Sequence, residues 1–243
     1  EPGFESIIAE HGFVVYRLAT VCAGGRLVTV PAKNYGTDLT TTLAAITERT
    51  RVIFIANPNN PTGTWVAKDE LRSFLRQVPE QIWVVLDEAY FEYIDAPDYP
   101  DGISLLGDFP NLIVTRTFSK IHALASIRLG YSISSPVMAD LLNRARQPFN
   151  CSGFALAAGV AALTDQDFVA TSAVLNHEGM AQLTAGVRAL GFDYIPSAGN
   201  FVSVDCACPG TEVFEALLRK GVITRPIAEY GLPRHLRISV GLA

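Results

Sequence analysis

Short apolar runs alternate with helical stretches through the first half of the chain, and this alternation constrains the fold more than any other feature. The apolar runs have the length of buried strands, and apolar residues recur at helical spacing between them. Continuous apolar strands separated by helices are typical of a mostly parallel sheet covered on both faces. We therefore predict an α/β fold, with ligands bound beyond the carboxyl ends of the strands. The predicted strands are residues 4–9, 26–30, 51–56, 82–86, 112–115 and 128–133.

The second half of the chain has a different pattern of predicted elements. After Pro136 the pattern predicts a helix, a break at residues 147–150, and then long Ala-rich and amphipathic helical segments up to Leu190. Two short strands with a helix between them follow, which favours a smaller α+β domain. We predict a large domain at residues 1–146 and a small C-terminal domain at residues 147–243. The later elements are expected at residues 139–146 and 213–218 (helices) and 201–204 and 236–240 (strands).

The composition excludes several classes of function. A chain of 243 residues that is 49% hydrophobic has core material for one large or two modest domains. The net charge of -5 and the scattered arginines argue against nucleic acid or an anionic membrane as a partner. The longest uncharged apolar run, residues 153–163, is about half the length of a membrane span and is predicted to be a buried helix.

The cysteines point to a reducing compartment. Cys22, Cys151, Cys206 and Cys208 lack the spacing of metal ligands, and no histidine lies near them in the sequence. We predict reduced packing residues, no bound metal and a cytoplasmic location.

Lys120 is the most informative residue for chemistry. It follows the predicted strand at residues 112–115, and an amine at the mouth of a strand can form a Schiff base with an aldehyde. Asn60 and Asp87 also follow predicted strands, so the three side chains are expected to converge on one crevice. Asp87 can pair with the pyridinium nitrogen of pyridoxal phosphate (PLP), while Tyr90 and Asn60 can donate to its phenolic oxygen.

A second group of residues can hold the phosphate of PLP. Thr117 and Ser119 offer hydroxyl groups, and Arg128 offers a bidentate guanidinium eight residues after Lys120. Hydroxyl groups and an arginine near Lys120 are also expected to keep its amine easily deprotonated and nucleophilic. Once released, Lys120 can carry a proton between the substrate's α-carbon and the cofactor.

Arg237 is a candidate for binding the substrate. It interrupts an apolar strand, where an arginine is costly unless it meets an anion. Arg225 is a second candidate for an anion, and together the two could serve a phosphate-bearing amine and a dicarboxylate in turn. Asn200 could contact the substrate or close a turn, and these readings stay open.

Several motifs together resemble those of the fold-type I PLP-dependent aminotransferases (class I/II). The sequence around these motifs is similar to that of histidinol-phosphate aminotransferases. The motifs are N-P-N-N-P-T-G at residues 57–63, D-E-A-Y at 87–90, T-F-S-K at 117–120 and R-I-S-V-G at 237–241, with supporting runs at 30–36, 146–150, 196–201 and 230–233. The resemblance covers essentially the whole chain, but the family's first quarter is missing. It implies a mostly parallel, seven-stranded-type sheet between helices, incomplete here, and a smaller α+β domain.

The resemblance also implies an activity and further contacts. The expected reaction is PLP-dependent transamination between L-histidinol phosphate and 2-oxoglutarate, giving imidazole acetol phosphate and glutamate in histidine biosynthesis. It implies a homodimer whose sites are built from both subunits. Phe13 takes the place of the ring that stacks on the pyridine, unless it is a core residue, and Tyr16 becomes a candidate substrate contact. One departure is Ala123-Leu-Ala-Ser126, where the family has G-L-A-G, so we expect a strained or shifted loop before Arg128.

Other functions remain as alternatives. Related enzymes that act on aromatic amino acids or decarboxylate threonine phosphate share most of these motifs. A catalytically silent fragment that acts only as a binding module is a second alternative. The strand before Asp87 also resembles the metal-binding strand of a P-loop ATPase, but the chain has no G-x-x-x-x-G-K-[ST] motif, and that reading leaves Lys120 unexplained.

Overall fold

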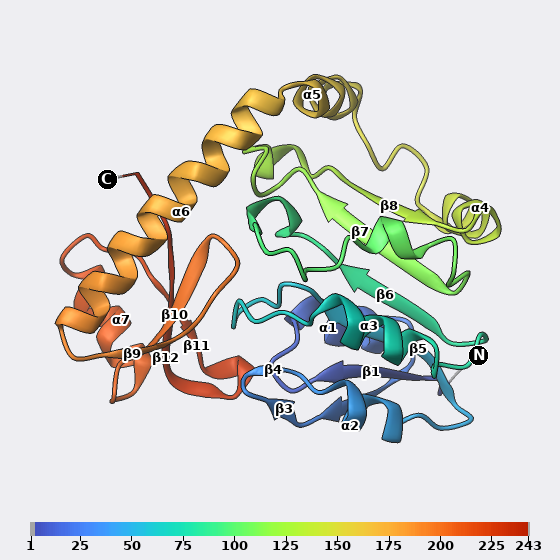
Figure 1. Ribbon diagram of the computed structural model, residues 1–243, viewed down its shortest axis with the longest axis horizontal. Helices are drawn as coiled ribbons and strands as arrows, with labels where there is room; N and C mark the ends of the chain where they lie inside the picture. Colours follow the sequence, from blue (N-terminus) through green and yellow to red (C-terminus); the bar gives the residue numbers. More distant parts are fainter. Residues whose placement is uncertain (1–2, 243) are drawn as a thin grey trace.

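The computed structural model describes residues 3–242, and a six-stranded sheet forms its larger half (Figure 1). The strand order is β2-β1-β5-β6-β7-β8, and every neighbouring pair is parallel except β7 and β8. This confirms the predicted α/β class and mostly parallel sheet, with one strand fewer than the seven expected of the family. The strands are β1 (Glu5–Ala9), β2 (Arg26–Val30), β5 (Thr50–Ala56), β6 (Trp83–Asp87), β7 (Leu112–Thr117) and β8 (Gly130–Ser134).

Alternating side chains of these strands serve two separate cores. On one face, Ile53 and Ile55 of β5 pack in a cluster with α2 (Leu39–Ala44) and α3 (Lys68–Leu75). On the other face, Phe54 packs with the side chain of Tyr16, which α1 (Val14–Cys22) contributes. Because successive strand residues point to opposite faces, one apolar run can bury itself on both sides.

The smaller half is an antiparallel sheet with the order β11-β12-β10-β9, drawn in orange to red in Figure 1. Val202 and Val204 of its central strand pack against Val187 of α6. This sheet and its helices have the α+β character that the sequence predicts. The elements are α6 (Gln166–Ala189), β9 (Asp193–Ile195), β10 (Phe201–Asp205), α7 (Gly210–Leu218), β11 (Arg225–Ile227) and β12 (Leu232–Ser239).

Short elements complete the described chain. A hairpin follows β2, and four 3₁₀ turns lie in the loops, one of them directly after β11. None of these was predicted, because each is only a few residues long. They are β3 (Ala32–Lys33), β4 (Gly36–Thr37), η1 (Phe91–Tyr93), η2 (Gly102–Leu105), η3 (Ala125–Ile127) and η4 (Ala228–Tyr230).

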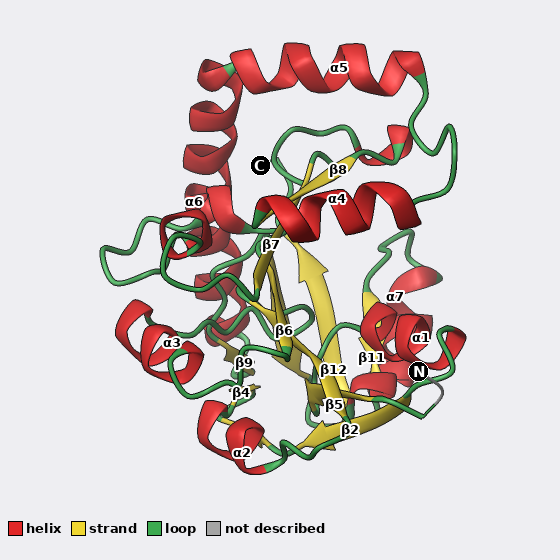
Figure 2. Cartoon of the chain, turned by 90° about the vertical axis from the view of Figure 1, so that its right-hand side faces the viewer, coloured by secondary structure: helices red, strands yellow, loops and turns green. Residues whose placement is uncertain are grey.

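The predicted buried helix at residues 153–163 forms, but it is not buried. It is α5 (Gly153–Thr164), which follows α4 (Pro136–Ala145) in the chain, lies at the outer end of the molecule and meets α6 at a corner (Figure 2). Only Ala155 and Gly159 of α5 are buried, whereas Phe154 is 90% exposed. The expectation was wrong because apolar residues surround this helix on all sides and the chain covers only one of them.

The contacts of α5 also bear on the domain boundary. Ala155 packs with Phe118 and Leu129, which belong to the region of β7 and β8. The predicted boundary at residue 146 would assign α5 to the small domain. We propose instead that the boundary falls along α6, whose later part packs on β10. Within residues 3–242, no helix is both long and apolar enough to cross a membrane.

Candidate active site

Three predicted residues meet where the parallel strands end. Asp87 is the last residue of β6, Asn60 lies in the loop after β5, and Lys120 follows β7 by three residues. All three line one pocket, together with Phe13 and Tyr90. The convergence predicted from the strand pattern is therefore present, at the edge where open α/β sheets bind ligands.

The three asparagines of the loop at residues 57–63 have different roles. Asn57 and Asn59 bond within the structure, whereas Asn60 lines the pocket. Asn57 exchanges two hydrogen bonds with the backbone of Val66, at 2.7 and 3.3 Å. The amide of Asn59 donates to the backbone oxygen of His11 at 3.0 Å and to Thr62 at 2.8 Å. These bonds hold the loop and leave the Asn60 side chain in the pocket, as the sequence predicts.

The small domain fixes the same loop from the other side. Ser203 of β10 donates to the backbone oxygen of Pro61 at 2.6 Å, and the backbone amide of Ala198 donates to Gly63 at 2.9 Å. Gly63 has a φ of +76°, and a β-carbon there would lie 2.0 Å from Oγ of Ser197. Gly63 is thus required both by its conformation and by the close approach of the small domain.

Asp87 is partly buried, and each of its carboxylate oxygens accepts a hydrogen bond. Its Oδ2 accepts from the hydroxyl of Tyr16 at 2.6 Å, and its Oδ1 accepts from the backbone amide of Ala89 at 3.1 Å. Burial raises the pKa of Asp87, while the hydrogen bond from Tyr16 is the largest influence that lowers it. The predicted role of Tyr16 as a substrate contact is not what this geometry shows, because its hydroxyl is committed to Asp87.

Lys120 has the electrostatic surroundings expected of a nucleophilic amine. Burial lowers its pKa, and the positive charges of Arg237 and Arg128 lower it further, whereas Asp87 acts in the opposite direction. Its Nζ lies 5.2 Å from the centre of the Tyr90 ring. A lowered pKa increases the fraction of neutral amine that can attack a carbonyl group.

Two aromatic residues line the same pocket. Tyr90 is buried, and its ring packs edge-on against Phe201 at 5.2 Å. Phe13 is half-buried and meets the Tyr16 ring edge-on, with centroids 5.8 Å apart. Both positions suit the predicted roles, a hydroxyl donor for Tyr90 and a stacking ring for Phe13, which remain predictions.

The residues predicted to bind phosphate lie outside this pocket. Oγ1 of Thr117 accepts from the backbone amide of Ser119 at 3.1 Å. Arg128 is exposed, and its guanidinium donates to the backbone oxygen of Ala125 at 2.7 Å. Arg128 is nevertheless close enough to Lys120 to lower the pKa of its amine. Arg128 therefore lies near the site, but it is exposed and does not line the pocket at the end where it was predicted to bind the phosphate.

The loop before Arg128 carries the strain expected at one of its two unusual positions. Ala123 has a φ of +56°, in the left-handed region where a β-carbon is unfavourable. Ser126 lies in η3 and has no such conformation. Arg128 itself also has a φ of +56°. A residue with a β-carbon in place of the family's glycine therefore strains the backbone at Ala123 but not at Ser126.

The other three predicted substrate residues, besides Tyr16, are not grouped together. Arg237 of β12 donates to Oδ1 of Asn60, a residue that lines the pocket, at 2.6 Å, and this bond links the small domain to the loop after β5. Arg225 is exposed and pairs with Glu229 at 2.9 Å. Asn200 lines a different pocket, which also contains Tyr93. The geometry favours Arg237 alone as a residue that faces the site.

Sequence reasoning missed a buried ionic network directly behind Asp87. Glu88 is fully buried and accepts two hydrogen bonds from Arg116, at 2.9 and 2.7 Å, and one from the amide of Gly102 at 2.7 Å. Arg116 also pairs with Asp101 at 2.8 Å. Burial raises the pKa of Glu88 to about 7. The clue was an arginine near the end of one strand, β7, together with an acidic residue that directly follows the neighbouring strand, β6.

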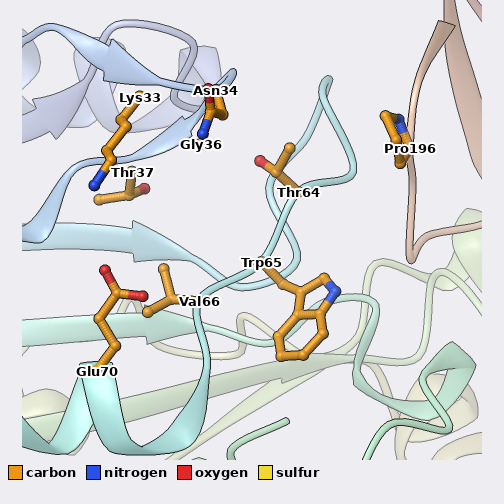
Figure 3. A pocket seen from close by; sticks show the side chains of 9 residues that line it. All are labelled: Lys33, Asn34, Gly36, Thr37, Thr64, Trp65, Val66, Glu70 and Pro196. Atoms are coloured by element: carbon orange, nitrogen blue, oxygen red, sulfur yellow. The ribbon is translucent and has the colours of Figure 1, made fainter. Parts of the chain in front are cut away.

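A separate pocket of about 340 Å³ lies between the β3–β4 hairpin and the segment that follows the asparagine loop (Figure 3). Lys33 and Glu70 line it on one side and Pro196 on the other. It contains none of the predicted site residues, and these three side chains are exposed or partly exposed. It is therefore distinct from the pocket of Asp87 and Lys120.

Comparisons with known proteins agree with this geometry. The family model for aminotransferase class I and II matches residues 1–243. A histidinol-phosphate aminotransferase 2 of Pseudomonas fluorescens is 55% identical over 241 residues, which cover 99% of this chain and 65% of that protein. A histidinol-phosphate aminotransferase 2 of Methylococcus capsulatus is 53% identical over 247 residues. The chain thus spans about 65% of the length of the first of these relatives.

Solved structures give the same result. The crystal structure of histidinol-phosphate aminotransferase from Sinorhizobium meliloti in complex with pyridoxal-5'-phosphate has a TM-score of 0.92 and 33% identity, covering 99% of this chain and 66% of that one. An aspartate aminotransferase mutant from Thermus thermophilus has a TM-score of 0.87 and 26% identity, covering 100% and 70%. On the matches to sequence and structure, the chain belongs to the aminotransferase class I and II family.

Proposed function

We propose that this chain binds PLP in the pocket that Asp87 and Lys120 share. The observation that carries the proposal is the placement of a lysine with a lowered pKa and a partly buried carboxylate on the same pocket. Lys120 would bond to the aldehyde and Asp87 would pair with the pyridine nitrogen. Phe13 would stack on the ring, and Tyr90 would donate to the phenolic oxygen. Thr117, Ser119 and Arg128 would bind the phosphate.

The proposed activity is transamination between L-histidinol phosphate and 2-oxoglutarate. When bound, PLP supplies the electron sink that makes the α-proton of an amino donor acidic. Lys120 would accept that proton and deliver it again, for which its lowered pKa is suited. Arg237 would hold the anionic end of each substrate in turn, because its guanidinium contacts Asn60 of the pocket and its charge lowers the pKa of Lys120.

The substrate assignment is supported mainly by the relatives. Proteins named histidinol-phosphate aminotransferase are 55% and 53% identical to this chain, whereas the aspartate aminotransferase match is 26% identical. The cationic side chain of Arg237 suits either a phosphate ester or a dicarboxylate. The products would be imidazole acetol phosphate and glutamate.

The first experiment tests the cofactor. The chain is incubated with PLP, reduced with borohydride and digested, and the mass adduct is mapped. We expect the adduct on Lys120, none in Lys120→Ala, and an unchanged yield in Lys33→Ala, whose lysine lines the separate pocket of Figure 3. An adduct spread over surface lysines, or none, would contradict the proposal.

The second experiment tests the substrate. Loss of the amino group is measured with histidinol phosphate, aromatic amino acids and threonine phosphate, each with 2-oxoglutarate. The proposal expects the highest kcat/KM with histidinol phosphate. A higher value with an aromatic amino acid, or release of CO₂ from threonine phosphate, would assign the chain to another enzyme of this fold.

We also propose a homodimer, supported by the apolar surface of α4, α5 and the segment between them. Val137, Phe149, Phe154 and Val160 are 71%, 98%, 90% and 68% exposed. Exposed apolar side chains in such number mark an interaction surface. In analytical ultracentrifugation, Phe154→Asp with Val160→Asp should dissociate the dimer, whereas Ile223→Asp, at another exposed apolar residue, should not. A monomeric parent chain would contradict the proposal.

The remaining parts of the proposal concern location and other partners. A cytoplasmic location is supported by the four cysteines, Cys22, Cys151, Cys206 and Cys208, which form no disulfide within the described residues. Cys22 and Cys208 are exposed, so the prediction that all four are packing residues was wrong for these two. Neither nucleic acid nor a membrane is proposed as a partner, in line with the net charge of -5.

A further inference from the structure

Tyr16 lines the pocket, but the contact of its hydroxyl group does not match its predicted role as a substrate contact. It lies in α1, is 6% exposed, and packs among apolar residues on the sheet face that carries Phe54. Its ring stacks on the Phe54 ring with centroids 4.8 Å apart and planes 5° apart. The ring therefore has a packing role that a phenylalanine could fill equally well.

The hydroxyl group of Tyr16 has a different function, because packing does not require it. A hydroxyl placed in an apolar cluster is costly unless it finds a hydrogen-bond partner. The partner of Tyr16 is Oδ2 of Asp87, at 2.6 Å, and both residues line the same pocket. A short bond between a hydroxyl and a carboxylate is among the stronger hydrogen bonds in proteins.

The two donors to Asp87 fix the orientation of its carboxylate. Ala89 donates its backbone amide to one oxygen and Tyr16 donates its hydroxyl to the other. Each oxygen of a carboxylate can accept more than one hydrogen bond, so capacity remains for a donor in the pocket. Rotation of the carboxylate about its terminal torsion would break both existing bonds.

We propose that Tyr16 is a positioning residue, which holds the Asp87 carboxylate ionised and oriented toward the pyridine nitrogen of the cofactor. The proposal rests on the proposed function, since it concerns the same pocket. Tyr16 acts only through Asp87, and no contact between Tyr16 and the substrate is needed. It explains why a tyrosine stands where α1 needs only an aromatic ring.

The electrostatics of the pair support this role. Burial raises the pKa of Asp87 and by itself would favour the neutral acid, which cannot stabilise a pyridinium. The hydrogen bond from Tyr16 opposes burial more than any other single contact of Asp87. The pKa of Tyr16 is raised by burial and by Asp87, so its hydroxyl stays protonated and remains a donor.

The test uses Tyr16→Phe, which keeps the stacked ring and removes only the hydroxyl. Asp87 is observed directly by NMR of chain labelled with ¹³C at the aspartate carboxyl carbons, with Asp87→Asn to assign its signal. We expect the titration midpoint of Asp87 to rise by about one pH unit in Tyr16→Phe, the shift expected from loss of a hydrogen bond to a charged group. Tyr194→Phe, which removes a phenol near Arg188, should leave the midpoint unchanged.

This titration needs no cofactor, so it decides the proposal even if the chain fails to bind PLP. An Asp87 midpoint that is the same in the parent chain and in Tyr16→Phe overturns it. A second measurement is the PLP dissociation constant by absorbance, which should be about 10-fold higher in Tyr16→Phe and unchanged in Tyr194→Phe. Equal affinities in the parent chain and Tyr16→Phe would also overturn the role toward the cofactor, whereas absence of binding in every variant would refute the proposed function instead.

Discussion

The two ends of the candidate site differ sharply in how the chain builds them. At the inner end, Asp87 and Asn60 have their side-chain positions fixed by Tyr16, Ala89 and Arg237. At the outer end, Arg128 is exposed and is anchored only to a backbone oxygen three residues earlier. The inner end is thus preorganised for a ring with one cationic nitrogen, while the outer end is open.

This difference follows from where each end lies in the fold. At the inner end, Asp87 is the last residue of β6, and Asn60 lies in the loop after β5, which the small domain holds in place through Ser203 and Arg237. The outer end lies on the turn after β7, which reaches Arg128 through residues in left-handed conformations. A site on strands is positioned more exactly than a site on a loop. We therefore expect substitutions at the inner end to have the larger effects.

The largest expected effect is that of Asp87→Ala on PLP binding. Removal of a partly buried carboxylate leaves the cofactor's ring nitrogen without its ionic partner, and breaking a buried pair costs about 3–5 kcal/mol. The PLP dissociation constant should therefore rise on the order of 10³-fold, as measured by absorbance titration. Ser119→Ala at the outer end removes one partly buried hydroxyl and should raise it only about fivefold.

A reversed order of these two variants would refute the comparison of the two ends. Asp87→Asn is the matched control, because it keeps the shape of the side chain and removes its charge. It should lie closer to Asp87→Ala than to the parent chain.

The second prediction concerns stability and pH. The pKa of Glu88 is about 7 in the folded chain, against roughly 4.3 for an unperturbed glutamate. Between these values the folded state holds more protons than the unfolded state, so the free energy of unfolding falls as pH rises from about 4.5 to 7. Glu88→Gln removes this contribution, about 3 kcal/mol across the window. Urea unfolding at pH 5 and pH 7.5 measures it.

The control is Glu215→Gln, whose carboxylate is 65% exposed and which should reproduce the pH dependence of the parent chain. If Glu88→Gln and the parent chain had the same pH dependence, the buried network behind Asp87 would not titrate in this range.

Much of the inner end could be predicted from the sequence, for a physical reason. Apolar strands and the residues that follow them are local patterns, and the carboxyl ends of parallel strands must share one edge of the sheet. This placed Asn60, Asp87 and Lys120 together. Tyr16 was assigned the wrong contact because the face of α1 that meets the sheet depends on packing between distant segments. No local pattern reveals that its hydroxyl would reach Asp87.

The exposed face of α5 was missed for a related reason. A helix that is apolar all round is normally buried, and a single sequence does not say which surface covers it. The pairing of Arg225 with Glu229 was also not foreseen, although the two are only four residues apart. Whether these two side chains meet depends on the turn from β11 into η4, which the sequence pattern did not predict.

The third prediction separates the two candidate substrate arginines. Maleate, an unreactive dicarboxylate, is titrated into the PLP-loaded chain and the absorbance change is followed. Arg237→Ala should weaken binding about 30-fold, as expected for loss of a charge-assisted pair facing the pocket. Arg225→Ala should weaken it about threefold or less, because Arg225 is exposed and already paired with Glu229. A larger effect of Arg225→Ala would assign the anion site to β11.

The smallest expected effect is at the outer end, in the strained loop. Ala123 has a φ of +56°, and a left-handed conformation costs a residue with a β-carbon about 1 kcal/mol relative to glycine. Ala123→Gly should therefore raise the free energy of unfolding by about 1 kcal/mol, and Tm by about 2–4 °C for a chain of this length. Ala125→Gly in η3, where φ is not positive, should instead lower the stability by about 0.5–1 kcal/mol. If both variants were destabilised equally, the loop would not be strained at Ala123. The exposure of Arg128 at the outer end would then not be caused by the residues that replace the family's glycines.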